Sequence, residues 1–191
     1  MTESAATSDD LAPLRQKTIV LVGLMGVGKS SVGRRLATAL NLPFRDADNE
    51  VEAAAGRSIS EIFAELGEAA FRDGERRVIA RLLDEPPHVL ATGGGAFVNA
   101  ETRALINEKA ISVWLKADIE LLARRVGRKD TRPLLKGKDP VAVLTELARV
   151  RNPAYAEAQV HVQTGDTPHG VAVDAILTAL RQRLAPGVPT E

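Results

Sequence analysis

The stretch "GLMGVGKSS", residues 23–31, directly follows the apolar run "TIVLV" and precedes a run with helical spacing of apolar residues. Gly23, four further residues and then Gly28, Lys29 and Ser30 match the pattern G-x-x-x-x-G-K-[ST], and the strand before it and helix after it are the context that this pattern requires. In such a loop backbone N–H groups converge on phosphate oxygens, the lysine neutralises phosphate charge and the serine reaches Mg²⁺. The stretch therefore predicts a loop for the phosphates of ATP, and a chance glycine-rich turn fits this context poorly.

The nucleotide contacts expected from this loop share a position between its second glycine and the first helical turn. They are Gly26, Val27, Gly28, Lys29, Ser30 and Ser31.

Length, charge and cysteine content limit what the rest of the chain can be. The 191 residues are 45% apolar, which is enough for one core and one domain. Lys plus Arg equals Asp plus Glu at 25 each, so no overall field favours nucleic acid or a membrane surface as a partner. There is no cysteine, which fits a cytoplasmic protein. We expect no membrane span, disordered residues 1–15 and a frayed end at 185–191.

Short apolar runs alternate with helical patterns along the domain expected at residues 16–184. Strands are predicted at 18–23, 43–48, 88–92, 110–115 and 160–164, and helices at 29–40, 58–83 (a pair), 100–107, 119–126, 141–155 and 171–184. Apolar strands separated by helices predict an α/β fold with a parallel sheet covered on both faces. Ligands of such sheets bind at the carboxyl ends of the strands.

Two carboxylates stand at the end of the second expected strand, in "FRDADNE" (44–50). Asp46 and Asp48 are two positions apart, so on a strand their side chains point to the same side. One could join the Mg²⁺ shell while the other accepts a hydrogen bond from an acceptor hydroxyl. An isolated D-x-D is more often a solvated strand end, but the phosphate loop favours the functional interpretation.

A glycine triplet follows the third expected strand, in "ATGGGAFV" (91–98). Gly93, Gly94 and Gly95 permit close approach of the backbone to a ligand, and their N–H groups can donate to a carboxylate or phosphate. A loop cluster without function is the alternative. No Asp ends this strand to serve the metal, which favours Asp46 as the metal carboxylate.

Arginines are spread over three later segments. Arg72 should open a long helix in which Glu75, at i+3, can orient it. Residues 124–138 hold seven basic residues against one Asp, which fits a mobile lid with Arg132 facing the phosphates. A solvated loop or a nucleic-acid patch are the alternatives, and the latter is disfavoured by 3% aromatic residues and zero net charge. Arg151 is expected near a helix end.

The order of these motifs is similar to that of the shikimate kinase family along residues 16–184. The matching segments are "GLMGVGKSS", "DADNEVE", "SISEIFAELGEAAFRDGE", "ATGGGAF", "TRPLL" and "RNPAYAEA". The resemblance implies a single-domain P-loop kinase with a five-stranded parallel sheet in the order 2-3-1-4-5 and a lid at about 124–138. It also implies phosphorylation of the 3-hydroxyl of shikimate with ATP and Mg²⁺, without a nucleic-acid or membrane partner, by a monomer.

The resemblance assigns roles to the motif residues. Ser30 and Asp46 would hold Mg²⁺, directly or through water, and Lys29 and Arg132 would face the phosphates. Arg125, or its neighbour Arg124, would line the adenine together with residues 164–168. The shikimate site would comprise Asp48, Arg72, Gly93, Gly94, Gly95 and Arg151, and the catalytic residues would be Asp48, Lys29 and Arg132.

Two other functions remain possible from the residues alone. A related kinase could act on gluconate or a nucleoside monophosphate, although Arg72, Arg151 and the glycine triplet favour a carboxylated ring. A P-loop ATPase or regulatory switch without a small acceptor would leave Asp48 and Arg72 without a function.

Overall fold

The computed structural model describes residues 11–127 and 138–184, and these form an α/β fold around one parallel sheet. Its strands are β1 (Thr18–Val22), β2 (Phe44–Asp46), β3 (Val89–Ala91), β4 (Ala110–Lys116) and β5 (Val160–Gln163). They lie in the order β2-β3-β1-β4-β5 and every neighbouring pair is parallel. The predicted fold class and strand order are therefore confirmed.

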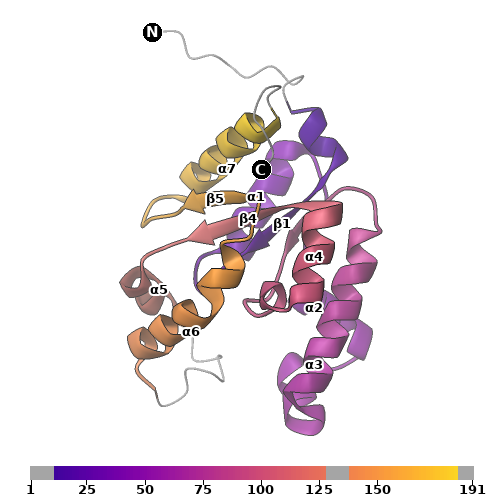
Figure 1. Cartoon of the computed structure of the whole chain (residues 1–191), viewed down its shortest axis with the longest axis vertical. Coiled ribbons are helices and arrows are strands. Elements are labelled where there is room, and N and C mark those ends of the chain that lie inside the picture. Colours follow the sequence, from indigo (N-terminus) through magenta and orange to yellow (C-terminus); the bar gives the residue numbers. More distant parts are fainter. Residues whose placement is uncertain (1–10, 128–137, 185–191) are drawn as a thin grey trace.

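Helices connect the strands and cover the sheet. They are α1 (Lys29–Leu40), α2 (Ala47–Ala55), α3 (Ile59–Leu83), α4 (Ala100–Lys109), α5 (Ile119–Val126), α6 (Pro140–Tyr155) and α7 (His169–Leu184), with 3₁₀ turns η1 (Pro13–Gln16) and η2 (Ala96–Val98). Helices α1 and α7 pack together, while α4 packs on β4. Figure 1 shows the α2–α3 and α5–α6 pairs as two arms below the sheet.

The central strand explains where the phosphate loop lies. All residues of β1 are buried, because β3 and β4 flank it and helices cover both faces. This double burial accounts for its continuous apolar sequence. Residues 23–28 leave the end of β1 and enter α1, so the loop sits at the middle of the carboxyl edge of the sheet.

Local sequence signals set the beginnings of the helices. Ser58 and Glu61 form a capping box at the start of α3, and Asp139 caps α6 through the N–H groups of its first turn. Gly67, with φ of 81°, interrupts α3, which confirms the expected pair of helices over this segment. Helix α3 packs with α2 in the arm seen in Figure 1.

The amino-terminal prediction needs one correction. Residues 13–16 form η1, and Leu14 is fully buried in the core, so the expected disorder is wrong over residues 11–15. The polar composition of the segment predicts disorder, but burial of the apolar Leu14 side chain anchors the segment to the core. The lid expected at 124–138 falls mostly on residues 128–137, outside the described residues, as does Arg132. Within residues 11–127 and 138–184, no helix has the length and apolar character needed to cross a bilayer.

Candidate active site

The phosphate loop is closely packed against the strand and helix beside it. A Cβ on Gly23 would lie 2.6 Å from the carbonyl oxygen of Leu115, and one on Gly26 would lie 2.8 Å from Cγ1 of Val126. Both glycines also have positive φ, at 138° and 83°. The loop therefore requires glycine at these positions for space and for conformation, and it leads to the amino terminus of α1, where unpaired N–H groups favour anions.

Lys29 is held above this loop. Its ammonium group donates to the carbonyl oxygens of Gly23 and Leu24 at 2.8 and 3.1 Å. It also lies close enough to Asp48 to lower the pKa of that carboxyl. The cation thus stands between the phosphate loop and the second carboxylate of "DAD".

Ser30 and Asp46 form the contact expected of a shared metal position. The Ser30 hydroxyl donates to Oδ2 of Asp46 at 2.6 Å, which joins the first turn of α1 to the end of β2. A hydroxyl and a carboxylate are the hard oxygen ligands that Mg²⁺ prefers. Across the described parts of the chain no group of three or more His, Cys, Asp or Glu side chains could hold a metal. The pair therefore fits Mg²⁺ as two protein ligands, with phosphate and water completing the shell.

A helix cap, and not a shared strand, determines how Asp46 and Asp48 lie relative to each other. The strand ends at Asp46, which caps α2, and its Oδ1 accepts from the Asp48 N–H at 3.1 Å. Asp48 lies in the first helical turn, so the predicted strand to residue 48 is wrong there. Burial and the nearby Asp46 raise the pKa of the Asp48 carboxyl, while Lys29 and Arg72 oppose that rise.

Arg72 is oriented by a buried carboxylate. Its Nη1 donates to Oε2 of Glu75 at 2.7 Å, and the Glu75 side chain is only 3% exposed. Burial raises the pKa of Glu75, and the Arg72 charge opposes that rise. Arg72 does not open a helix as expected, because it lies inside α3 after the break at Gly67. The i+3 pairing predicted from the sequence is confirmed.

The glycine triplet is the surface on which these charged groups meet. A Cβ on Gly93 would lie 2.7 Å from Glu75 Oε1 and 3.0 Å from Asp48 Oδ1. One on Gly95 would lie 2.6 Å from Nη2 of Arg72, and one on Gly94 would lie 3.1 Å from Nη1 of Arg151. The structure therefore brings Asp48, Arg72 and Arg151 from α2, α3 and α6 against one stretch of backbone.

Space for a ligand opens beside this cluster. A cavity of about 230 Å³ is lined by residues of α3, of the triplet and of the segment up to α4: Arg72, Glu75, Arg76, Gly95, Ala96, Val98, Asn99 and Thr102. Its position next to a guanidinium makes it suitable for part of an anionic molecule.

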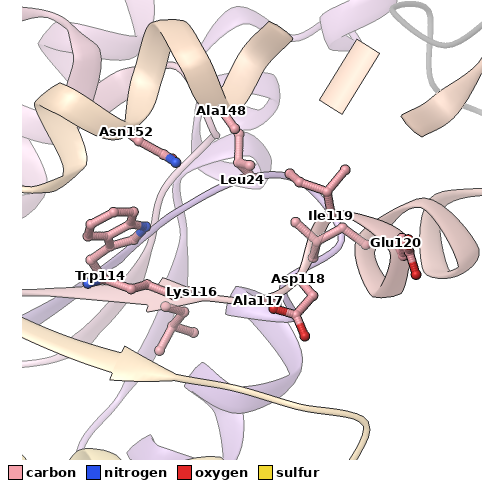
Figure 2. A pocket seen from close by; sticks show the side chains of 11 residues that line it. Leu24, Trp114, Lys116, Ala117, Asp118, Ile119, Glu120, Ala148 and Asn152 are labelled. Atoms are coloured by element: carbon pink, nitrogen blue, oxygen red, sulfur yellow. The ribbon is translucent and has the colours of Figure 1, made fainter. Parts of the chain in front are cut away.

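A second, larger cavity of about 600 Å³ is lined by Leu24 of the phosphate loop together with residues of β4, α5 and α6, and Figure 2 shows its lining side chains. The described residues that line it are Leu24, Trp114, Leu115, Lys116, Ala117, Asp118, Ile119, Glu120, Leu122, Ala148 and Asn152. None of them is a residue that the sequence predicted for the site. The cavity adjoins the site through Leu24 and Asn152 and contributes none of the charged groups described above.

Arg125 reaches the loop expected at the adenine. Its Nη2 donates to the Gly165 carbonyl at 2.8 Å, and its side chain is 24% exposed against 62% for Arg124. Both arginines lie 3.9 Å from a carboxylate oxygen of Asp166, but Arg125 is the less exposed of the two and adds the hydrogen bond to Gly165.

Tyr155 is a site residue that the sequence did not indicate. It is fully buried at the end of α6, and its hydroxyl donates to the carbonyl oxygen of Gly94. Its position one helical turn after Arg151 is the only signal that could have found it.

Comparisons with known proteins agree with this geometry. The model of the family described as shikimate kinase matches residues 25–181. A shikimate kinase from Caulobacter vibrioides is 90% identical over 175 residues, which span 92% of this chain and 88% of the relative. One from Bradyrhizobium diazoefficiens is 53% identical over 182 residues, or 95% of this chain and 88% of the relative.

A solved structure extends the agreement to the fold. Shikimate kinase from Acinetobacter baumannii in complex with shikimate superposes with a TM-score of 0.86 at 35% identity, covering 92% of this chain and 99% of that one. With its phosphate loop, paired aspartates and arginine-lined glycine triplet, the chain belongs to the shikimate kinase family.

Proposed function

We propose that this chain performs the reaction of its family through the residues assembled around the glycine triplet. That reaction transfers a phosphoryl group from ATP to the 3-hydroxyl of shikimate and yields shikimate 3-phosphate and ADP, a step toward chorismate and the aromatic amino acids. The observation that carries the assignment of residues is the approach of Asp48, Arg72 and Arg151 to one stretch of backbone beside the phosphate loop.

The acceptor site matches the chemistry of shikimate. Shikimate has one carboxylate and three hydroxyls, so its pocket needs cations on one side and a hydrogen-bond acceptor on the other. Arg72 and Arg151 supply guanidinium groups that can bind a carboxylate with two parallel hydrogen bonds. Asp48 supplies the acceptor, and residues 93–95 leave room for the ring because they lack side chains.

Asp48 is the group that would orient the reacting hydroxyl and take its proton. It lies next to both Lys29 and Arg72, between the phosphate loop and the acceptor cations. Burial raises its pKa, which makes it a better base than an exposed aspartate. Phosphoryl transfer depends mainly on placement and charge neutralisation, so the proton can move late.

The phosphates would be held by the loop, by Lys29 and by the first turn of α1. When bound, Mg²⁺ neutralises charge on the phosphates and thereby aids transfer. Ser30 and Asp46 would hold it, since the hydrogen bond between them already brings two oxygen ligands together. Residues 26–28 and Ser31 would supply further loop contacts, and Arg132, outside the described residues, would contact the transferred group.

The nucleotide base would lie between α5 and the loop after β5. Arg125 joins these two segments through Gly165, which supports its position at the adenine edge. We propose that the enzyme acts as a monomer in the cytoplasm, where ATP is made. Light scattering of the purified protein tests the monomer.

Release of ADP with different acceptors tests the function. Shikimate should support turnover at least about a hundredfold faster than gluconate or AMP. Gluconate carries its carboxylate and hydroxyls on a flexible open chain and not on a ring, and AMP has no carboxylate for the two arginines. ADP release of equal rate without any acceptor would indicate an ATPase or a switch and would overturn the proposal.

A further inference from the structure

Tyr155 connects three parts of the molecule through one buried side chain. The residue is fully buried, and its ring lies 5.8 Å from that of Trp114 on β4. Its hydroxyl donates to the carbonyl of Gly94, in the triplet after β3. A tyrosine buried at the end of a helix would normally need only a hydrogen-bond partner. Here that partner is the backbone on which the acceptor residues converge.

Arg151 stands one turn before Tyr155 on α6. Burial raises the pKa of the Tyr155 hydroxyl, and the nearby charge of Arg151 opposes that rise. A Cβ on Gly94 would lie only 3.1 Å from Nη1 of Arg151 and 3.6 Å from the carbonyl oxygen of Gly23, so Gly94 is close to both groups. Tyr155, Arg151 and Gly94 therefore form one contact group next to the phosphate loop.

The Gly94 carbonyl and the Gly95 N–H belong to the same peptide unit. This unit is planar and trans, so its C=O and N–H point in opposite directions. A hydroxyl that holds the carbonyl on the α6 side consequently directs the Gly95 N–H away from Tyr155. Three consecutive glycines have no side chains to fix their own orientation, so an external anchor has a large effect on them.

We propose that Tyr155 is a positioning residue for the acceptor, which holds the Gly94–Gly95 peptide and the Arg151 guanidinium in the orientation that binds shikimate. The inference rests on the proposed function, in which the triplet and Arg151 form the shikimate site. Tyr155 acts through these two groups, since its hydroxyl donates to the Gly94 carbonyl oxygen in the triplet.

Tyr155→Phe tests the proposal, because it removes the hydroxyl and keeps the ring against Trp114. The KM for shikimate and its dissociation constant by calorimetry should both rise roughly tenfold, the effect of losing one hydrogen bond of ordinary strength. The KM for MgATP should stay within about twofold, since the hydroxyl does not contact the phosphate loop.

Ser112→Ala is the matched control for a lost buried hydroxyl. Ser112 is fully buried on β4, where its hydroxyl donates to Asn107 at 2.6 Å and accepts from the Gln159 N–H at 2.9 Å. Its loss should lower the melting temperature but leave the KM for shikimate unchanged. If Tyr155→Phe raises both Michaelis constants equally, or if Ser112→Ala raises the shikimate KM as much, Tyr155 is a structural residue and the proposal is wrong.

A double-mutant cycle separates this inference from the proposed function. Arg151→Lys should raise the shikimate KM, and adding Tyr155→Phe to it should cost less than it does alone, since both changes disturb one contact group. Full additivity would contradict the proposal. If Arg151→Lys itself had no effect, the acceptor site would be wrong; if only Tyr155→Phe had none, the site would stand and the positioning role would fall.

Discussion

Asp46 and Asp48 show how two identical side chains two positions apart receive different surroundings. Asp46 bonds to Ser30 and caps α2, whereas Asp48 is turned toward Lys29, Arg72 and the triplet. The first arrangement suits the metal ligand that we propose, and the second suits the proposed group that faces the acceptor. The chemical difference comes from the helix that begins between them.

Asparagine substitutions should separate these two roles. Asp46→Asn should raise the Mg²⁺ concentration for half-maximal rate by about tenfold, and extra Mg²⁺ should restore part of the activity, because a neutral amide is a weaker ligand. Asp48→Asn should lower kcat by at least about a hundredfold without metal rescue, since the amide cannot take a proton. Titrations of both variants with Mg²⁺ and shikimate provide the measurement, and equal rescue of both would make the pair a shared metal site.

Lys29 gives a second prediction at this scale. Lys29→Met keeps the length of the side chain but removes the charge, so turnover should fall at least about a hundredfold while the fold is retained. ADP release measured alongside circular dichroism checks both parts. Turnover near the unaltered rate in a folded variant would remove the lysine from the mechanism.

At the scale of elements, the segment after β3 lies in close contact with α3, and adding one methyl group to Gly95 tests this contact. A Cβ on Gly95 would lie within 2.7 Å of three atoms of the Arg72 guanidinium. This group is the end of a flexible side chain and can move aside, but then it no longer occupies its place beside the triplet. Gly95→Ala should therefore raise the shikimate KM at least about tenfold with little loss of stability.

Gly74→Ala is the control for that variant. Gly74 lies in α3, and beyond its own stretch of helix no atom lies within 4 Å of the place that a Cβ would take, so alanine should stabilise the protein by up to about 1 kcal/mol and leave the kinetics unchanged. Thermal unfolding and steady-state kinetics of both variants decide the matter. An unchanged shikimate KM in Gly95→Ala would show that Arg72 does not need its observed position.

The elements also show what could be predicted from the sequence. Continuous apolar runs, the G-x-x-x-x-G-K-S pattern and glycine clusters are local signals, and they predict the strands and the loop between β1 and α1. The convergence of Asp48, Arg72 and Arg151 on the triplet follows from the fold. The sequence predicts a strand through Asp48, but Asp46 caps α2, so the strand ends before Asp48. Leu14 and Tyr155 depend on packing between distant segments, which no local pattern encodes.

At the scale of the whole molecule, the arm formed by α5 and α6 should control nucleotide affinity. Arg125 donates a hydrogen bond to the loop after β5 at 2.8 Å, whereas Arg124 is 62% exposed and reaches this loop only through an ion pair with Asp166 at 3.9 Å, which solvent screens. Arg125→Ala should raise the KM for ATP by about tenfold, and Arg124→Ala should change it by less than about twofold. Initial rates at varied ATP check this, and equal effects would mean that charge alone is responsible.

The central claim is that elements from both arms place two arginines on one side of the acceptor. Calorimetry of shikimate and its methyl ester with the unaltered protein and with Arg72→Met tests it most directly. The ester should bind the unaltered protein at least about tenfold more weakly than the acid, and Arg72→Met should remove most of that difference. Equal affinity of acid and ester for the unaltered protein, or an undiminished difference in Arg72→Met, would contradict the account.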